Sequence, residues 1–267
     1  MEWSGLLGLS PWGYVISTVA LTHVTIASVS IFLHRHQTHR SLSLHPIASH
    51  FFRFWLWITT GMFTQEWVAV HRKHHAVCEV EGDPHSPCIW GIWRVLFGGV
   101  ALYRLAARDA DVIAAYGFGT PDDWLERHVY GAHRLLGIAI LLLVDLALFG
   151  LPGLLVYLVQ MLWIPFWAAG VVNGVGHYWG YRNFETRDAS RNILPLGLLI
   201  GGEELHNNHH AHAYSARFSS KWWELDISWL YIRILERVGL ATVKRTARLR
   251  RGEDTERQIP ANKRASA

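Results

Sequence analysis

The chain alternates between long apolar stretches without charge and shorter polar segments. Residues 12–33 contain no charged side chain, and about 20 apolar residues are enough for a helix to span a bilayer. Glu2 precedes this stretch, whereas Arg35 and Arg40 follow it. Because cytoplasmic flanks are enriched in Lys and Arg, we predict a spanning helix with its N-terminus outside and its other end in the cytoplasm.

Three more apolar stretches follow. Residues 51–63 are too few to span and include Arg53, which predicts an interfacial or re-entrant helix whose arginine reaches the lipid headgroups. Residues 135–149 and 154–172 are joined by the uncharged segment 150–153, which predicts two spanning helices and a short outside turn. The expected fold is an all-α integral membrane protein with about three transmembrane helices and one interfacial helix.

The polar segments predict a cytoplasmic helical cap. Residues 76–134 are typical of short helices and loops, and residues 222–239 of an amphipathic helix. We expect one membrane-bound domain over residues 1–240. Residues 241–267 hold eight Lys/Arg against three acids, a charge of about +5, and predict a flexible basic tail.

Composition agrees with a membrane protein: of 267 residues, 51% are hydrophobic, only 17% are charged, and 14 are tryptophan. The net charge of +4 comes from the tail, where attraction to anionic lipid headgroups or plain solvation is a better interpretation than nucleic-acid binding. Cys78 and Cys88 do not form a C-x-x-C pair. We therefore expect no disulfide framework and interpret both residues as cytoplasmic thiols.

Histidines gather beside the apolar segments at regular spacing. On a helix, positions i, i+3 and i+4 share one face, so two H-x-x-H-H boxes could each aim three imidazoles in one direction. A third pair is five residues apart, about 140° on an ideal α-helix, and should bridge a helix end and the following loop. The boxes contain His34 and His39; His71, His74 and His75; and His206, His209 and His210. Eight imidazoles exceed the four ligands of one tetrahedral zinc and indicate two transition metals.

These motifs resemble the membrane-bound fatty acid desaturase family. The matching segments read HRHQTHRS (34–41), HRKHHAVCEVEGDPH (71–85) and EELHNNHH (203–210). A fourth segment, NGVGH (173–177), is similar to the one that supplies an extra ligand in the Δ9 branch. The closest likeness is to bacterial Δ9 desaturases that act on acyl groups of membrane lipids in the inner membrane.

The resemblance implies an oxidoreductase with two irons that uses O2 and two electrons to introduce a cis double bond. Its implied metal ligands are His34, His39, His71, His74, His75, His177, His206, His209 and His210, with Asn173 acting through water. All boxes must then lie on one side of the membrane. Such ligands are usually oriented by neighbouring carboxylates; those nearest in sequence are Glu79, Asp83, Glu203 and Glu204. Trp163, Trp167 and Tyr178 could line an acyl tunnel or simply pack.

One departure bears on the substrate. Acyl-CoA members of the family carry an Arg-Asp pair just before the second box, where this chain has the apolar segment 67–70. That change favours acyl chains esterified to phospholipid, with an acyl-CoA Δ9 desaturase and a related di-iron hydroxylase as alternatives. With no attached cytochrome domain expected, electrons would come from a separate ferredoxin or flavin reductase. A metal transporter or a haem subunit fits less well, because the boxes gather at cytoplasmic ends and haem needs fewer histidines.

Overall fold

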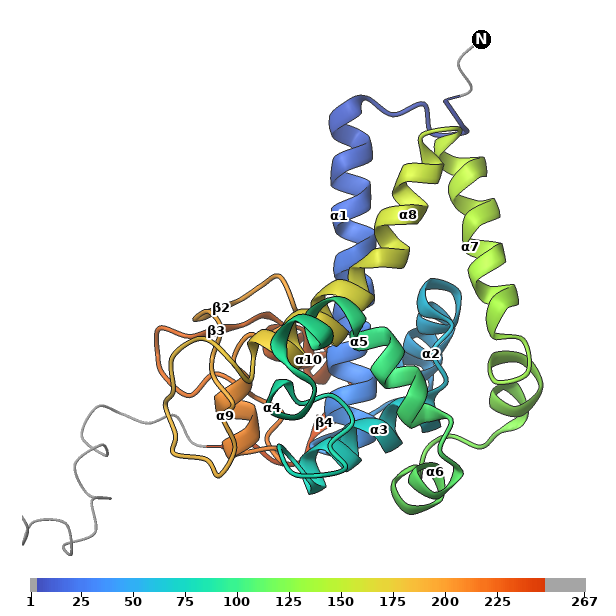
Figure 1. The fold of residues 1–267 in the computed structure, drawn as a ribbon. Coiled ribbons are helices and arrows are strands. Elements are labelled where there is room, and N and C mark those ends of the chain that lie inside the picture. Colours follow the sequence, from blue (N-terminus) through green and yellow to red (C-terminus); the bar gives the residue numbers. More distant parts are fainter. Residues whose placement is uncertain (1–3, 248–267) are drawn as a thin grey trace, which may run out of the picture.

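The computed structural model describes residues 4–247 and is mostly helical. Three of them extend in one direction, and most of the shorter elements gather at their other end (Figure 1). The long elements are α1 (Pro11–Ser28) with its continuation η1 (Val29–Thr38), α7 (Arg134–Phe149), and α8 (Gly153–Ile164) with its continuation η3 (Pro165–Val175). The η segments are π-helical, with hydrogen bonds from residue i to residue i+5.

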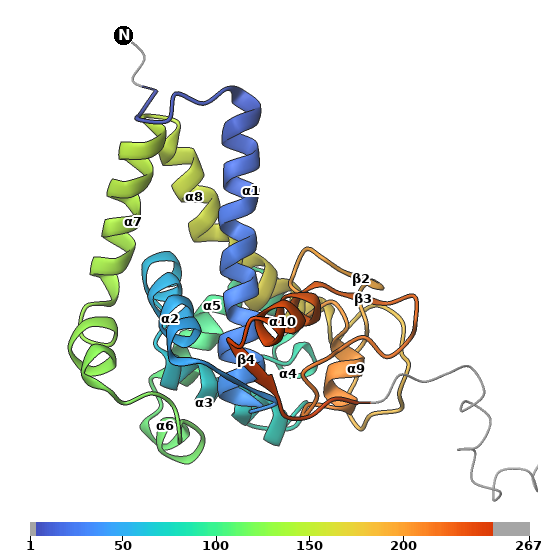
Figure 2. The same ribbon diagram turned by 180° about the vertical axis from the view of Figure 1, so that it is seen from behind.

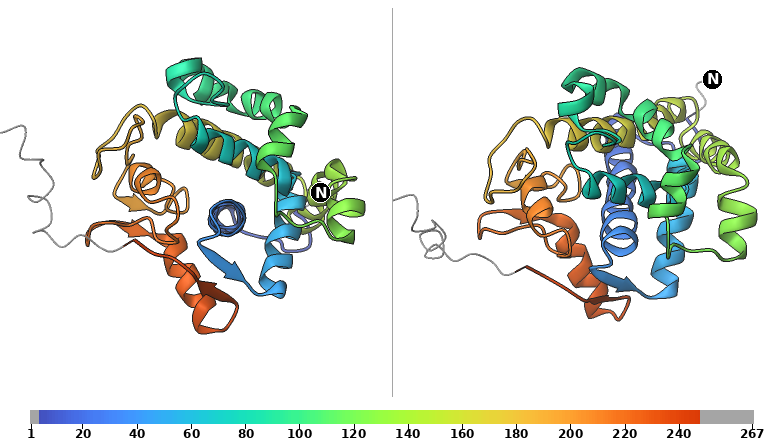
Figure 3. Two further views of the ribbon diagram at one scale, coloured as in Figure 1. Left: turned by 90° about the horizontal axis from the view of Figure 1, so that it is seen from below. Right: turned by 60° about the horizontal axis from the view of Figure 1, so that its bottom comes forward.

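The shorter elements surround the end of η1. Seen from below, η1 lies in the middle and the other elements encircle it (Figure 3). The helices among them are α2 (Pro46–Thr60), α3 (Thr64–Ala76), α4 (Pro87–Trp90), α5 (Ile92–Ala107), α6 (Ala110–Tyr116), η2 (Glu126–Tyr130), α9 (His206–Ala211) and α10 (Ile227–Arg237). The hydrophobic core forms where η1, α2, η3 and α10 meet, around Phe32, Leu56 and Ile232.

Two short strand pairs close the fold. β1 (Leu42–Leu44) pairs antiparallel with β4 (Ala241–Val243), and β2 (Leu196–Gly197) pairs parallel with β3 (Leu225–Asp226). β4 and α10 lie beside the lower part of the first helix (Figure 2). The expected boundary at residue 240 is therefore misplaced, because β4 belongs to the body; the rest of the predicted tail from residue 248 lies outside the described residues.

Two helices among residues 4–247 are long and apolar enough to cross a membrane, Pro11–Thr38 and Gly153–Val175. They contain the first and third predicted spans. The helix expected over residues 51–63 starts earlier, at Pro46, where the His45 side chain accepts a hydrogen bond from the Ile47 N–H. The amphipathic helix expected from residue 222 begins later, at Ile227.

The sequence predicted that Arg53 reaches outward to the lipid headgroups, but the structure shows that it does not. Its side chain is buried, and its guanidinium donates to Asp123 at 2.6 Å and to Glu126 at 2.7 Å. Burial raises the pKa of Glu126, while the hydrogen bonds from Arg53 lower the pKa of Asp123 to about 2. A buried guanidinium needs such partners, and here they tie α2 to the first residue of η2 and to the segment before it.

Close backbone packing holds α5 against η3. A Cβ atom added at Gly99 would lie 2.2 Å from the Ala169 carbonyl oxygen, and one at Gly170 would lie 2.4 Å from the Leu96 carbonyl oxygen. Only glycine permits this approach at either position. Because η3 contains Asn173 and ends two residues before His177, the contact also fixes where these two residues lie.

We expect Gly99→Ala to destabilise the protein by about 1–3 kcal/mol, because the backbone of η3 must move to admit the new methyl group. Gly98→Ala is the matched control, since a Cβ there would meet only the Arg94 side chain at 4.0 Å. The control should be neutral or slightly stabilising. Thermal unfolding in the same detergent measures both variants, and equal midpoints would contradict the packing argument.

Candidate metal centre

The second histidine box lies in the last turns of α3, as its spacing predicted. His71, His74 and His75 share one face of the helix, and His74 is fully buried. Between them Arg72 turns the other way and donates to the backbone carbonyls of Tyr116 and Phe118. The alternation of histidine and basic residues thus separates a face that turns inward from one that anchors the neighbouring loop.

The third box forms the short helix α9, which the intervening asparagines hold in place. The side-chain oxygen of Asn207 accepts from the backbone N–H groups of Asn183 and Phe184, both at 2.9 Å. The Asn208 amide donates to Glu224 at 2.8 Å. His206, His209 and His210 are thereby directed inward by a network whose partners lie on the opposite side of the same short helix.

The first box depends on the π-helical geometry of η1. On an α-helix His34 and His39 would diverge, but here the His39 N–H donates to the His34 carbonyl at 3.1 Å. This i to i+5 bond brings the two residues to the same side of the helix, where their rings meet edge-on with centroids 4.9 Å apart. The pair does end the helix, as expected, with His39 as its C-terminal cap.

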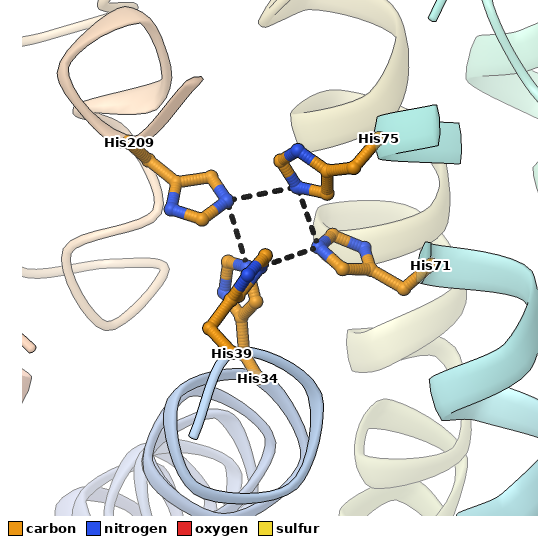
Figure 4. A group of neighbouring side chains, drawn as sticks. All are labelled: His34, His39, His71, His75 and His209. Atoms are coloured by element: carbon orange, nitrogen blue, oxygen red, sulfur yellow. Dashed lines mark hydrogen bonds between the residues drawn. The ribbon is translucent and has the colours of Figure 1, made fainter. Parts of the chain in front are cut away.

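Five histidines from three elements meet in a first cluster (Figure 4). His34 Nε2 and His75 Nε2 each lie 3.0 Å from His209 Nε2. His71 Nε2 lies 3.1 Å from His75 Nε2 and 3.4 Å from His39 Nε2. Ligand atoms this close, offered from different directions, could hold one metal ion.

The remaining four predicted histidine ligands form a second cluster. His177 Nε2 lies 2.9 Å from His206 Nε2, and the His177 ring is 4.9 Å from that of His74 and 4.7 Å from that of His210. Cys78, which sequence reasoning left out, brings its Sγ atom to 3.8 Å from His74 Nε2. The nine predicted histidines therefore divide into sets of five and four.

Carboxylates orient four of the nine rings through the Nδ1 atom. The contacts are His34 to Glu203 at 2.7 Å, His74 to Asp83 at 3.0 Å, His177 to Glu79 at 3.0 Å and His210 to Asp188 at 3.0 Å. A neutral imidazole that donates through Nδ1 presents a bare lone pair at Nε2. Several such lone pairs face one another at short range, an arrangement that a cation stabilises, so this donor set fits metal ions.

The orienting carboxylates were only partly foreseen. Glu79, Asp83 and Glu203 contact histidines, but Glu204 instead accepts from the backbone N–H groups of Ile200 and Gly202. Burial raises the pKa of Glu204 to about 7. Asp188 was missed, because no spacing rule singles it out in its polar loop. His85, which we kept outside the ligand set, is buried and stacks on His74 with centroids 4.4 Å apart.

Burial keeps six of the clustered imidazoles neutral. It lowers the pKa well below the ordinary histidine value, and neighbouring histidines lower it further, for His39, His71, His75, His206, His209 and His210. Neutral imidazole is the form that binds metal. Glu203 is also buried, which raises its pKa, but His34 and Arg35 outweigh burial and keep the pKa of this carboxylate below its ordinary value.

The metal-free protein should lose stability as the pH falls. Burial lowers the folded-state pKa of these six histidines below their unfolded value of about 6.5, so the unfolded chain binds protons first. Their contribution is complete above pH ~6.5 and is lost below it. We expect the unfolding midpoint, followed by tryptophan fluorescence in the presence of a chelator, to fall steeply between about pH 7 and pH 5. A midpoint that stays level over that range would contradict neutral clustered imidazoles.

An apolar cavity of about 640 Å³ borders the histidine clusters, within the range of small-molecule sites. His34, His71, His206 and Asn173 form part of its wall. The rest comes from α2, α3, α5, α7 and the continuous helix of α8 and η3, and includes Trp67, Val70, Ile164 and Ala168. A hydrocarbon chain in this space would pass directly beside the candidate metal sites.

The predicted tunnel residues lie elsewhere. Trp163 and Trp167 pack together, with ring centroids 5.7 Å apart, against the hydrophobic core, and Tyr178 is 63% exposed. The opposite side of the same helix, with Ile164 and Ala168, lines the cavity. Of the two alternatives that the sequence left open, packing therefore holds for Trp163 and Trp167, and the rotation of the helix determines which side faces the cavity.

Comparison with known proteins agrees with this geometry. The fatty acid desaturase family model matches residues 9–242. The chain is a member of the fatty acid desaturase family. It is 31% identical over 244 residues to the Delta-9 desaturase-like 5 protein of Arabidopsis thaliana, covering 88% of this chain and 79% of the relative. The Delta-9 acyl-lipid desaturase 2 of the same plant is also 31% identical over 253 residues, covering 88% and 76%.

A third relative of this desaturase has another specificity. The Acyl-CoA C20 Delta5-desaturase of Anemone leveillei is 32% identical over 229 residues, covering 81% of this chain and 69% of the relative. Relatives of equal similarity thus differ in the position of the double bond and in the form of the substrate. The family indicates an oxidoreductase that acts on fatty acids, and the finer specificity must be argued from this chain's own cavity.

Proposed function

We propose that this desaturase introduces a cis double bond at the ninth carbon of saturated acyl chains esterified to membrane phospholipid. Two iron ions would be held by the five-histidine and the four-histidine cluster, with Asn173 assisting through water. The observation that carries the proposal is the apolar cavity whose wall includes residues of both clusters. Irons bound there would supply the oxidising power, with O2 as co-substrate, that an unactivated methylene requires.

The overall reaction balances with an external reductant. The acyl chain loses two hydrogen atoms from neighbouring carbons, O2 takes these with two further protons and two electrons, and two waters leave. The electrons would come from a separate protein of the ferredoxin or flavin reductase type. The protein's own contribution is to orient the histidines through their carboxylates, to exclude bulk water with the apolar wall, and to hold the chain in place.

The substrate form is inferred from the segment before the second box and from the mouth of the cavity. Val68, Ala69 and Val70 are buried, so the segment that replaces the Arg-Asp pair is core and cannot clamp a CoA headgroup. Arg104 and Arg108 line the cavity with exposed side chains, beside Leu135, which is 80% exposed. Exposed arginines next to an exposed leucine suit the boundary between phosphate headgroups and lipid tails.

The proposed topology has three spans. Besides the two long helices, α7 has 16 residues, about 24 Å at the α-helical rise, and it exposes Leu143 and Val144. It packs along α8 and would cross back with it. Three spans keep all histidine boxes on one side, together with the short elements. The flanking charges support a proposed orientation with that side and the C-terminus in the cytoplasm, and we propose the cytoplasmic membrane as the location of the protein.

Expression in a host without its own desaturase tests the function. We expect cis monoenes with the double bond at the ninth carbon, located by mass spectrometry of the fatty acid methyl esters. Purified protein with a ferredoxin and its reductase should then convert stearoyl phospholipid in vesicles and leave stearoyl-CoA largely unchanged. Conversion of stearoyl-CoA alone would reassign the substrate. Unchanged lipids from well-expressed protein with two bound irons would contradict desaturation itself.

A further inference from the structure

Two buried polar atoms on the cavity wall, away from the histidine clusters, have no hydrogen-bond partner among the described residues. They are the Tyr103 hydroxyl and the Gln160 Oε1 atom. Other polar groups of the same wall are satisfied: the Thr60 hydroxyl donates to the Leu56 carbonyl, and Glu66 pairs with Arg134 through two hydrogen bonds. An unpartnered buried polar atom is costly, and both side chains belong to residues that line a ligand-sized cavity.

The surroundings of Tyr103 follow the chemical order of an acyl ester. Val100, Tyr103 and Ala107 lie on one side of α5 and line the cavity, while the exposed Arg104 and Arg108 flank them. Toward the C-terminal end of α5 the wall therefore changes from apolar to neutral polar to charged. A phospholipid presents the same sequence, from methylene chain to ester carbonyl to phosphate.

The Tyr103 hydroxyl can act as a hydrogen-bond donor. Burial and the nearby Glu66 carboxylate raise the pKa of its phenol, so the proton stays on the oxygen. The free atom of Gln160 is an acceptor, and its amide nitrogen already donates to Asp145 at 2.8 Å. A carbonyl oxygen accepts but does not donate. Of the two unpartnered atoms, only the hydroxyl of Tyr103 can therefore bind an ester carbonyl.

We propose that Tyr103 is a positioning residue whose hydroxyl donates a hydrogen bond to the ester carbonyl of the substrate and so determines how far the acyl chain reaches toward the histidines. This inference rests on the proposed acyl-lipid function. The backbone of α5 supports it, because its close contact with η3 at Gly99 holds Tyr103 in a constant position relative to Asn173 and His177. The position of the double bond would then be determined by the distance between the Tyr103 hydroxyl and the histidine clusters.

Binding tests the inference without turnover. The metal-loaded protein is titrated in detergent with distearoyl phosphatidylglycerol and with its ether-linked analogue, which lacks the carbonyl, and the affinities are derived from thermal unfolding midpoints. The wild type should bind the ester about 3- to 10-fold more tightly, the effect of one neutral hydrogen bond. Tyr103→Phe, which keeps the ring, should bind both lipids equally, and the control Tyr157→Phe, outside the cavity wall, should behave as wild type.

Product analysis is the second readout. Wild type and Tyr157→Phe should give one double-bond position, whereas Tyr103→Phe should give a mixture of neighbouring positions, with a KM raised about 3- to 10-fold and kcat little changed. Equal binding of ester and ether by the wild type, or an unchanged position and KM in Tyr103→Phe, would overturn the assignment. Ester preference without any turnover would instead leave the carbonyl contact standing and refute the proposed desaturation.

Discussion

Replacing His74 with alanine should lower desaturation at least about 100-fold and remove iron from the four-histidine cluster, a loss larger than that expected for an outer contact. The His74 side chain is fully buried, donates to Asp83 through Nδ1, and lies beside the rings of His177 and His210. Alanine leaves a cavity there and removes the only side chain that donates to Asp83 among the described residues, which leaves this carboxylate with its backbone N–H donors alone. Monoenes in the expression host and iron bound per purified chain measure the two effects.

His50→Ala is the matched control, because His50 is an exposed histidine on α2, away from both clusters. It should retain full activity and the iron content of the wild type. Two irons per chain and undiminished monoenes in His74→Ala would show that the four-histidine cluster does not hold a metal. Loss of folded protein in His74→Ala alone would be recognised by size-exclusion chromatography and thermal unfolding, and the milder His74→Gln would then be compared at equal folded concentration.

The parts of the site that could be predicted depend on local periodicity. The inward faces of α3 and α9 follow from the i, i+3, i+4 spacing, which any α-helix converts into one face. The first box did not follow the same rule, because η1 is π-helical. No pattern in residues 29–38 predicts that change. It is observed in the structure, where the rings of His34 and His39 meet edge-on.

Contacts between segments that are distant in the sequence could not be predicted from it. Arg53 was interpreted as a headgroup contact because its apolar surroundings in the chain are typical of an interfacial helix, yet its partners Asp123 and Glu126 lie about 70 residues away. The rotation of the continuous helix of α8 and η3 about its own axis could not be predicted either. The sequence left open whether Trp163 and Trp167 pack or line a tunnel. They pack against the hydrophobic core, and that choice depends on how the helix packs against α5 at Gly170.

Asp188→Asn should weaken iron binding about 10- to 100-fold, the usual effect of removing a carboxylate that orients a metal-bound histidine. Asp188 accepts from His210 Nδ1 at 3.0 Å and from the backbone N–H of Ser190 at 3.0 Å. An amide keeps the size of the side chain but not its charge. It can also present its NH2 group to His210, which would favour the tautomer whose Nε2 carries the proton and cannot bind metal.

Glu185→Gln is the control for this substitution, since Glu185 is an exposed acid in the same loop and loses the same charge. Chelator competition should show weaker iron binding for Asp188→Asn only, with desaturation restored in part by added iron. That rescue separates an orienting role from a folding role, because an unfolded centre would not recover with metal. Equal iron affinities for the two variants would mean that His210 needs no carboxylate partner. In that case Asp188 would not be what keeps the proton on Nδ1 of His210 and the lone pair free on Nε2.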